Sequence, residues 1–559
     1  MKRGLDAYEH SVGTVLLGVA VVWIAIAFRW RADAIFSETF LWGDGAHNLV
    51  VCQQLLSGKL FFRDVFSQYG PLPSYVYAGI AVLFGNTVRT YMSMVALLTV
   101  VDVWMIWILL RRNVSWMTAL IVCLVGVFPV FLLPGSFTAG YPETIYYGFE
   151  RAGLLLAVIL WRPAVTATFT RALLLGLCLG FLQTIKFGSC FVLGLAIIAV
   201  DVGLLCRTGM TRETLTRWAR SNVAILLGFA VVEATLAVVA FASMPEMMAK
   251  DFLWPSYMLE GYSSYVTAGT RGFQWMGVRF FVVRQLGPVC ALLMAGTAAI
   301  GLFSPSLKLS NLSSKTFPAR LLILTIFYLI ALFVYLKQIW LIYAYVWVLL
   351  LSVSYAFEQL NRWWRGVFVA ASLPCLWVNL KCLSPNQRAE DVSYHIVARD
   401  MGLWLSRKAI WRVDSLKRIL WRVRSESGPS QNALMIVPGG SGLHLGFGVP
   451  PVSRHTWFLV GVIRSYDEGN LLDAIDRCFA VVCLSDHPFI QGPSKNPALW
   501  PLYPNGTPFG SDLGKAIAEK LDGPIEVDDG CWIFPVKHRT LFGDNVTAMQ
   551  SGRIRPQAE

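Results

Sequence analysis

The stretch that decides the fold is residues 42–75. It contains Trp42-Gly43-Asp44-Gly45-Ala46-His47-Asn48, then Gly58-Lys59-Leu60-Phe61-Phe62-Arg63-Asp64, and then Gln68-Tyr69-Gly70-Pro71-Leu72. This polar, glycine-rich stretch follows the first apolar run of the chain, so it predicts a loop where the chain leaves the membrane. It holds a carboxylate between glycines, a basic pair and a Tyr-Gly-Pro turn. We expect it to form one wall of a site at the membrane surface.

The composition is that of a membrane protein with several spans. Of the 559 residues, 56% are hydrophobic and 14% are charged, and the mean hydropathy is +0.56; about a quarter of the residues in soluble domains are charged. The net charge is +13, and the excess falls at helix ends and in one late segment. Anionic lipid or phosphate is therefore expected as a partner, and nucleic acid is not. The 11 cysteines show no Cys-x-x-Cys or Cys/His cluster, so no zinc site is expected.

Apolar runs predict about eleven membrane helices, because a helix needs roughly 20 apolar residues to cross a bilayer. The first run, residues 12–28, lacks a small-residue cleavage site and is expected to remain as a helix. The others are expected near residues 88–110, 115–134, 146–161, 171–185, 188–206, 222–243, 281–303, 319–336, 339–357 and 366–381. Residues 1–381 thus form the predicted membrane module.

Basic residues predict how this module is oriented. With the N-terminus in the cytoplasm, every predicted inner loop carries Lys or Arg, as the positive-inside rule requires. The long loops 29–87 and 244–280, which are rich in aromatic residues, Gly and Pro, then lie outside. Within the first of them, residues 44–56 predict an amphipathic surface helix and residues 73–84 an apolar helix lying on or dipping into the membrane. The outer face is the predicted working face.

The chain after the last span divides in two. Residues 382–424 are basic and carry Trp404, Trp411 and Trp421, so we expect a segment lying along lipid headgroups. Residues 425–559 predict a small α/β domain outside the membrane. One strand is expected to start at Ala433 and to run into a glycine turn at residues 439–442, a second strand is expected at 478–484, and a helix at 511–521.

Charged side chains at membrane depth are costly and therefore mark candidate sites. Lys186 and Lys337 each occupy a tight outer turn between apolar spans, where two ammonium groups would hold a phosphate whose lipid tail lies between helices. The alternative is that they cap helix ends or reach the headgroups. Arg151 directly follows Glu150, which leaves a local ion pair open. Asp44 between glycines is also compatible with an ordinary helix cap.

Several of these residues resemble the opening of the GT-C membrane glycosyltransferases. The resemblance rests on Asp44 after the first span, the 58–64 segment, Tyr69-Gly70-Pro71-Leu72, a Phe84-Gly85 step and Arg89. Residues 174–186 are similar to the Gly-rich helix of that family that ends in Lys. The nearer relatives are bacterial enzymes of the protein O-mannosyltransferase, aminoarabinose transferase and lipid A galacturonosyltransferase type.

The resemblance implies a GT-C fold and an inverting transfer of sugar from a polyprenyl-phosphate donor to an acceptor hydroxyl. The acceptor would be a cell-envelope glycan, a glycolipid or lipid A at the outer face of a bacterial inner membrane, with Asp44 as base. Many members have two acids where this chain has one, so a second carboxylate is either dispensable or supplied from elsewhere, and Glu143 is the candidate. A divalent metal is compatible but not required, and no cofactor is expected. Expected phosphate ligands are Lys186, Lys337, Arg151 and Arg271, and expected sugar or prenyl contacts are Tyr69, His47, Trp254, Tyr257 and Trp275.

Two other classes of function remain open. A transporter or flippase of lipid-linked sugars would suit the apolar spans, but the sequence shows neither an internal repeat nor paired Gly/Pro-broken helices. A non-catalytic scaffold for envelope assembly is the second alternative, which the large outer domain permits.

Overall fold

The computed structural model describes ten stretches of the chain, which belong to two compact units. The described residues are 44–67, 69–111, 145–253, 316–334, 392–394, 404–437, 441–453, 465–484, 516–528 without 518, and 531–537, together with positions 15, 18, 19, 22, 116 and 119. Residues 69–253 and 316–334 belong to unit 1. Residues 44–67 and 392–537 belong to unit 2.

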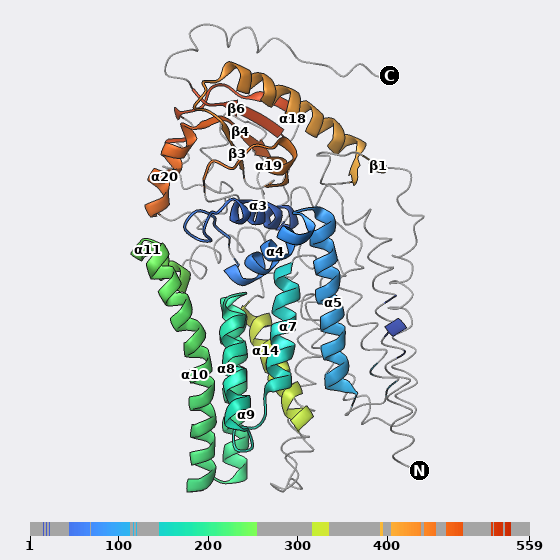
Figure 1. Cartoon of the computed structure of the whole chain (residues 1–559), viewed down its shortest axis with the longest axis vertical. Helices are drawn as coiled ribbons and strands as arrows, with labels where there is room; N and C mark the ends of the chain where they lie inside the picture. The colour runs from blue at the N-terminus through green and yellow to red at the C-terminus, as the bar shows by residue number, and fades with distance from the viewer. Residues whose placement is uncertain are drawn as a thin grey trace. The chain divides into compact units, whose positions relative to one another are not determined.

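Unit 1 is built from helices, several of which run side by side (Figure 1). Val88–Leu110, Gly188–Arg207 and Arg212–Ser243 are long and apolar enough to cross a membrane. The described helices are α4 (Pro71–Phe84), α5 (Val88–Leu110), α7 (Ile145–Leu160), α8 (Phe169–Gln183), α9 (Phe187–Thr208), α10 (Arg212–Ser243), α11 (Glu246–Leu253) and α14 (Thr316–Val334).

Helices lie at six of the predicted spans, with bounds within a few residues of those predicted except at the start of one. Three of the six, α5, α9 and α10, are long and apolar enough to cross a membrane. The span expected from residue 222 begins at Arg212, because the Thr211 hydroxyl accepts a hydrogen bond from the Thr214 amide and a Glu213–Arg217 ion pair supports the first turns. Spans 281–303, 339–357 and 366–381 lie outside the described residues, and 12–28 and 115–134 are described at scattered positions. The count of eleven therefore stays a prediction.

Glycines let α8 and α10 approach closely. A Cβ atom on Gly176 would collide with the carbonyl oxygen of Ile225, and one on Gly228 would collide with that of Leu173. Small residues serve this purpose between membrane helices, where close van der Waals contact drives association. The Gly-rich segment 174–186 is thus a packing surface up to the turn that carries its lysine.

Arginines close the C-terminal end of α7. Arg171 of α8 donates hydrogen bonds from Nε to the carbonyl of Leu160 (2.6 Å) and from Nη2 to that of Ile159 (2.7 Å). Arg320 of α14 donates from Nη2 to the carbonyls of Ile159 (2.6 Å) and Trp161 (3.2 Å). The last carbonyls of a helix lack intrahelical partners and carry the negative end of its dipole. These basic residues therefore tie α7 to its neighbours.

Unit 2 contains a small α/β fold. Its four-stranded sheet has the order β3-β4-β6-β5, with β3 and β4 parallel and the other pairs antiparallel. The elements are α3 (Asp44–Leu56), β1 (Val392–Tyr394), β2 (Trp404–Ser406), α18 (Arg407–Glu426), β3 (Ala433–Val437), α19 (Ser441–Phe447), α20 (Ser465–Ile475), β4 (Cys478–Leu484), β5 (Ile525–Asp528) and β6 (Cys531–Pro535). Both predicted strands are confirmed. Of the predicted helix 511–521, the helical positions described are 516, 517 and 519.

The first-loop helix α3 has the predicted bounds but not the predicted environment. It packs against α19 of the same unit, and its residues 45–52 are buried. An amphipathic helix on a membrane surface would expose its polar side chains, yet His47, Asn48 and Gln54 are 4%, 2% and 5% exposed. The expectation of a surface helix is therefore wrong for α3. Helix α4 keeps the exposed apolar side chains Val82, Leu83 and Phe84, as expected for a helix in contact with lipid.

We predict that unit 2 loses stability in mild acid through two histidines on the contacting helices α3 and α19. Burial lowers the pKa of His47 and of His444 from 6.5 to about 4. As the pH falls from 6.5 to 4, the unfolded chain binds protons that the folded chain does not, so the folded state loses about 3 kcal/mol per histidine.

Hydrogen exchange measures this effect as protection factors of the β3 and β4 amides. We expect lower protection at about pH 5 than at about pH 7.5. The difference in protection between the two pH values should be smaller in the His47→Gln variant. It should be smaller still in the double variant His47→Gln with His444→Gln. Equal protection at the two pH values would contradict the proposed destabilisation by His47 and His444.

Candidate functional site

Two sequence motifs meet at one end of the unit 1 helices. The Gly70 amide donates a hydrogen bond to the carbonyl of Ile185 (3.0 Å), and the Leu72 amide donates to that of Thr184 (3.3 Å). A Cβ atom on Gly70 would collide with the Thr184 carbonyl oxygen, so this approach requires glycine. We call residues 69–72 together with 184–186 the motif junction.

Tyrosines form one side of the motif junction. The Tyr69 ring stacks on Tyr146, with centroids 4.3 Å apart and planes 23° apart, and lies edge-on to Tyr147 at 6.3 Å. The Tyr91 hydroxyl accepts a hydrogen bond from the Ile145 amide (3.1 Å). The hydroxyls of Ser74 and Tyr146 are hydrogen-bonded to each other. These contacts fix the start of α7 against α4 and α5. Tyr69 is 7% exposed, so most of its ring is covered.

Lys186 lies in the turn between α8 and α9, as predicted, and its ammonium group is held from two sides. Its Nζ is 3.3 Å from Glu150 Oε2 and 4.9 Å from the centroid of the Tyr147 ring. The Ser189 hydroxyl donates a hydrogen bond to the other oxygen of Glu150. Glu150 is 1% exposed, whereas the Lys186 side chain is 16% exposed. Lys186 thus reaches inward to a buried carboxylate and keeps some access to solvent.

Arg151 pairs with a different helix from its neighbour Glu150. Its Nε lies 2.7 Å from Asp102 Oδ2 of α5, and the two side chains are 7% and 2% exposed. The sequence left a local Glu150–Arg151 ion pair open, and the structure pairs each of these residues with a partner distant in the sequence. A buried charge without a partner is strongly destabilising, and here each charge on α7 has a partner outside α7, in the α8–α9 turn for Glu150 and on α5 for Arg151.

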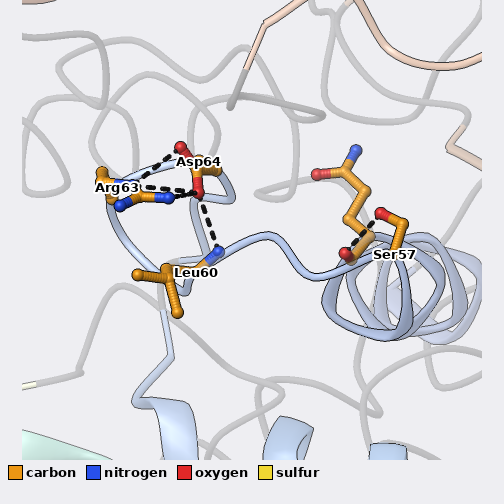
Figure 2. A network of polar contacts seen from close by, with 5 residues as sticks. Ser57, Leu60, Arg63 and Asp64 are labelled. Carbon is orange, nitrogen blue, oxygen red and sulfur yellow. Dashed lines mark hydrogen bonds and ion pairs between the residues drawn. The ribbon is translucent and has the colours of Figure 1, made fainter. Parts of the chain in front are cut away.

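The Gly58–Asp64 segment forms a tight turn in unit 2. Figure 2 shows the Arg63 guanidinium and the Leu60 amide converging on the Asp64 carboxylate, with bonds of 2.7 Å from Arg63 Nη2 and 2.9 Å from Leu60 N. The hydrogen bonds from Arg63 hold the pKa of the Asp64 carboxyl below its ordinary value, and the charge of Lys59 lowers it further. The predicted basic pair is Lys59 and Arg63, and the charge of Arg63 is therefore neutralised by Asp64.

The remaining candidates divide between described and undescribed parts of the chain. Asp44 is the first residue of α3, and His47 is buried in the same helix. Glu143, Lys337, Arg271, Trp254, Tyr257 and Trp275 lie outside the described residues. Within the described ranges, no three His, Cys, Asp or Glu residues are grouped so that they could hold a metal ion.

Glu150, Ser189, Tyr146 and Tyr147 belong to the site, although the sequence marked only Glu150, as a charged residue in an apolar run next to Arg151. The signal was a carboxylate within an apolar run, one helical turn after two adjacent tyrosines. Residues three and four apart share a helix face, so this spacing puts the tyrosines and Glu150 on one side of α7. No local feature of the sequence marked Lys186, in the α8–α9 turn, as the partner of Glu150.

Comparisons with known proteins give distant similarity to solved structures. No protein-family model and no curated protein sequence matches the chain. The chain is similar to the crystal structure of ArnT from Cupriavidus metallidurans in the apo state, with 13% identity and a TM-score of 0.43, covering 78% of this chain and 86% of that one. It is also similar to ArnT from the same organism bound to undecaprenyl phosphate, with 13% identity and a TM-score of 0.45, covering 98% and 100%.

We predict that the motif junction depends on the absence of a side chain at Gly70. Gly70→Ala forces the backbone away from Thr184, and we expect a loss of about 2–3 kcal/mol of stability. Gly79→Ala in α4 is the matched control, because nothing lies within 4 Å of its added methyl group, and alanine favours a helix by up to about 1 kcal/mol. Thermal unfolding of the purified chain in detergent measures both, and equal melting temperatures would refute the close approach.

Proposed function

We propose that the protein is a membrane glycosyltransferase that transfers a sugar from a polyprenyl-phosphate donor to an acceptor hydroxyl. The observation that supports this best is the motif junction. Two segments that carry the resemblance to GT-C enzymes, Tyr69–Leu72 and Thr184–Lys186, are hydrogen-bonded to each other beside a partly accessible ammonium group. Aromatic surface together with a few placed polar groups is the usual make-up of a ligand site.

Lys186 is the proposed ligand of the donor phosphate. A phosphate oxygen and a carboxylate oxygen are equivalent hydrogen-bond acceptors for an ammonium group, and Glu150 already occupies Lys186 in this way. The donor phosphate would share or replace that contact. Tyr147 lies beneath the ammonium group, and Tyr69 and Tyr146 stack on each other next to it, so the three buried rings hold the site in place. Tyr69 stays the proposed contact to the sugar or the prenyl chain. Lys337, Arg271 and Arg151 are the further proposed cations.

The proposed reaction is a single displacement that inverts the anomeric centre. The acceptor oxygen bonds to the anomeric carbon while the bond from that carbon to the phosphate oxygen breaks, and the electron pair leaves with the polyprenyl phosphate. The acceptor proton passes to a carboxylate, which the resemblance implies is Asp44, with Glu143 as the second acid. Lys186 stabilises the charge that grows on the leaving phosphate. No step requires a metal ion.

The proposed setting is the outer face of a bacterial inner membrane. The motif junction joins the N-terminal ends of α4, α7 and α9 with the C-terminal end of α8. In the topology inferred from the basic loops, all of these ends face outward. The acceptor in this setting is a cell-envelope glycan, a glycolipid or lipid A.

We predict opposite effects of removing the two members of the Lys186–Glu150 pair. Lys186→Met should weaken binding of undecaprenyl phosphate by roughly 10- to 100-fold, because a charge-assisted hydrogen bond is worth about 1.5–3 kcal/mol. Glu150→Gln should tighten binding several-fold, because it removes the carboxylate that competes for the ammonium group. Native mass spectrometry of the purified chain in detergent measures the bound lipid.

A double variant separates phosphate binding from stability. Lys186→Met alone removes the charged partner of a buried carboxylate, which costs up to about 3–5 kcal/mol. Lys186→Met with Glu150→Gln removes both charges, so stability should return while lipid binding stays weak. If the double variant binds undecaprenyl phosphate as the unmodified chain does, Lys186 is not the phosphate ligand.

We further predict that Asp44→Asn abolishes sugar transfer and leaves lipid binding intact. A general base contributes roughly 10²- to 10⁴-fold to a rate, and asparagine begins a helix about as well as aspartate, so folding should be preserved. The assay supplies the purified chain with radiolabelled polyprenyl-phosphate sugars and scores labelled acceptor.

Each outcome of this assay distinguishes the three classes of function. Unchanged transfer by the Asp44→Asn variant shows that Asp44 is not the base, and the glycosyltransferase function still stands. Movement of labelled lipid across a vesicle without transfer indicates the flippase. An unmodified chain that binds no undecaprenyl phosphate contradicts both of these functions and favours the scaffold.

A further inference from the structure

Four apolar side chains of α18 form a stripe that packs within unit 2. Val413, Leu416, Leu420 and Val423 are all buried, at 5% exposure or less, and α18 contacts β4 and β5. An amphipathic helix that binds a membrane in the usual way buries this stripe among lipid chains. Because the rest of unit 2 already covers these four side chains, they are not available to the bilayer interior.

The outer face of α18 is nevertheless unusual for a helix that faces water. Trp411 and Trp421 are 41% and 51% exposed, and Lys417, Arg418 and Arg422 are exposed beside them. With 3.6 residues per turn, these positions share one side of the helix. We call these five residues the α18 outer face.

The cations of the α18 outer face are not neutralised within the described part of the chain. The helix has seven basic and two acidic residues, and among the described residues no carboxylate forms an ion pair with Lys417, Arg418 or Arg422. These exposed cations therefore attract anionic partners from outside this set.

A shallow apolar hollow adjoins this face. The Arg424 guanidinium lies 5.1 Å from the centroid of the Trp421 ring and 5.9 Å from that of Phe479. Lys417 and Arg424 thus stand beside apolar surface, so an anion bound there would meet both charge and aromatic rings. The hollow is lined by Lys417, Leu420, Trp421, Arg424, Phe447, Val449 and Phe479.

We propose that the α18 outer face binds the headgroups of anionic phospholipids at the bilayer surface. Basic side chains are attracted to anionic lipid, and tryptophan favours the headgroup region because one edge of its ring is polar and the rest apolar. The same chain carries helices apolar enough to span a membrane, so a bilayer is always at high effective concentration. This binding does not depend on the proposed sugar transfer.

Photocrosslinking of the full-length chain in nanodiscs tests the proposal. Trp411→benzoylphenylalanine places a photoreactive ring on the α18 outer face, and Asn470→benzoylphenylalanine on α20, also exposed, is the control site. The discs contain phosphatidylcholine alone or with phosphatidylglycerol. We expect crosslinks to phosphatidylglycerol from position 411 and not from position 470, with a yield that falls as salt is raised.

A charge series, with the photoreactive ring kept at position 411, decides whether the cations are responsible. Lys417→Gln, Arg418→Gln and Arg422→Gln together should lower the yield about ten-fold or more, because each basic residue near anionic lipid contributes roughly five-fold. Lys417→Arg, Arg418→Lys and Arg422→Lys preserve the charge and should preserve the yield. A yield independent of phosphatidylglycerol, or a crosslink to a second polypeptide, would overturn the proposal.

Discussion

The buried carboxylate of Glu150 constrains most of the candidate site. At 1% exposure it must be paired, because an unpartnered buried charge is strongly destabilising. Its partners, Lys186 and Ser189, stand at the start of α9, so satisfying one carboxylate fixes the α8–α9 turn against α7. The same turn then presents the carbonyls of Thr184 and Ile185 to the Gly70 segment. Packing, turn geometry and the position of the ammonium group follow from one electrostatic requirement.

Helix positions were predictable where the apolar run and the helix coincide. The run 88–110 gave the bounds of α5 because Thr87 caps its first turn and arginine follows its last. The start of α10 was missed because hydropathy reports which residues suit a membrane, whereas a helix continues into polar sequence when caps and ion pairs support it. For α3 the bounds were predictable and the burial was not, since the helix that covers it, α19, lies far along the chain.

The site shows the same division between local and distant information. A lysine in a short turn between apolar runs marked Lys186 from sequence, but its partner depended on how α7 packs. Adjacency suggested that Glu150 pairs with Arg151, although consecutive residues on a helix point about 100° apart. That geometry alone favours partners on two different neighbouring helices, which is the arrangement formed with Lys186 and Asp102. Helical geometry was therefore a better guide than proximity in sequence.

Helix α18 shows why amphipathic character does not identify a membrane helix. An apolar stripe is satisfied equally by lipid chains or by a sheet, and here it packs on β4 and β5. The side of α18 that faces away from the sheet is the one that indicates whether the helix contacts a membrane. A helix that only covers a soluble domain faces water mainly with polar side chains. Two exposed tryptophans, among cations that no carboxylate of the described ranges neutralises, satisfy the physical requirements of a headgroup layer, where aromatic rings and positive charge are both stabilised.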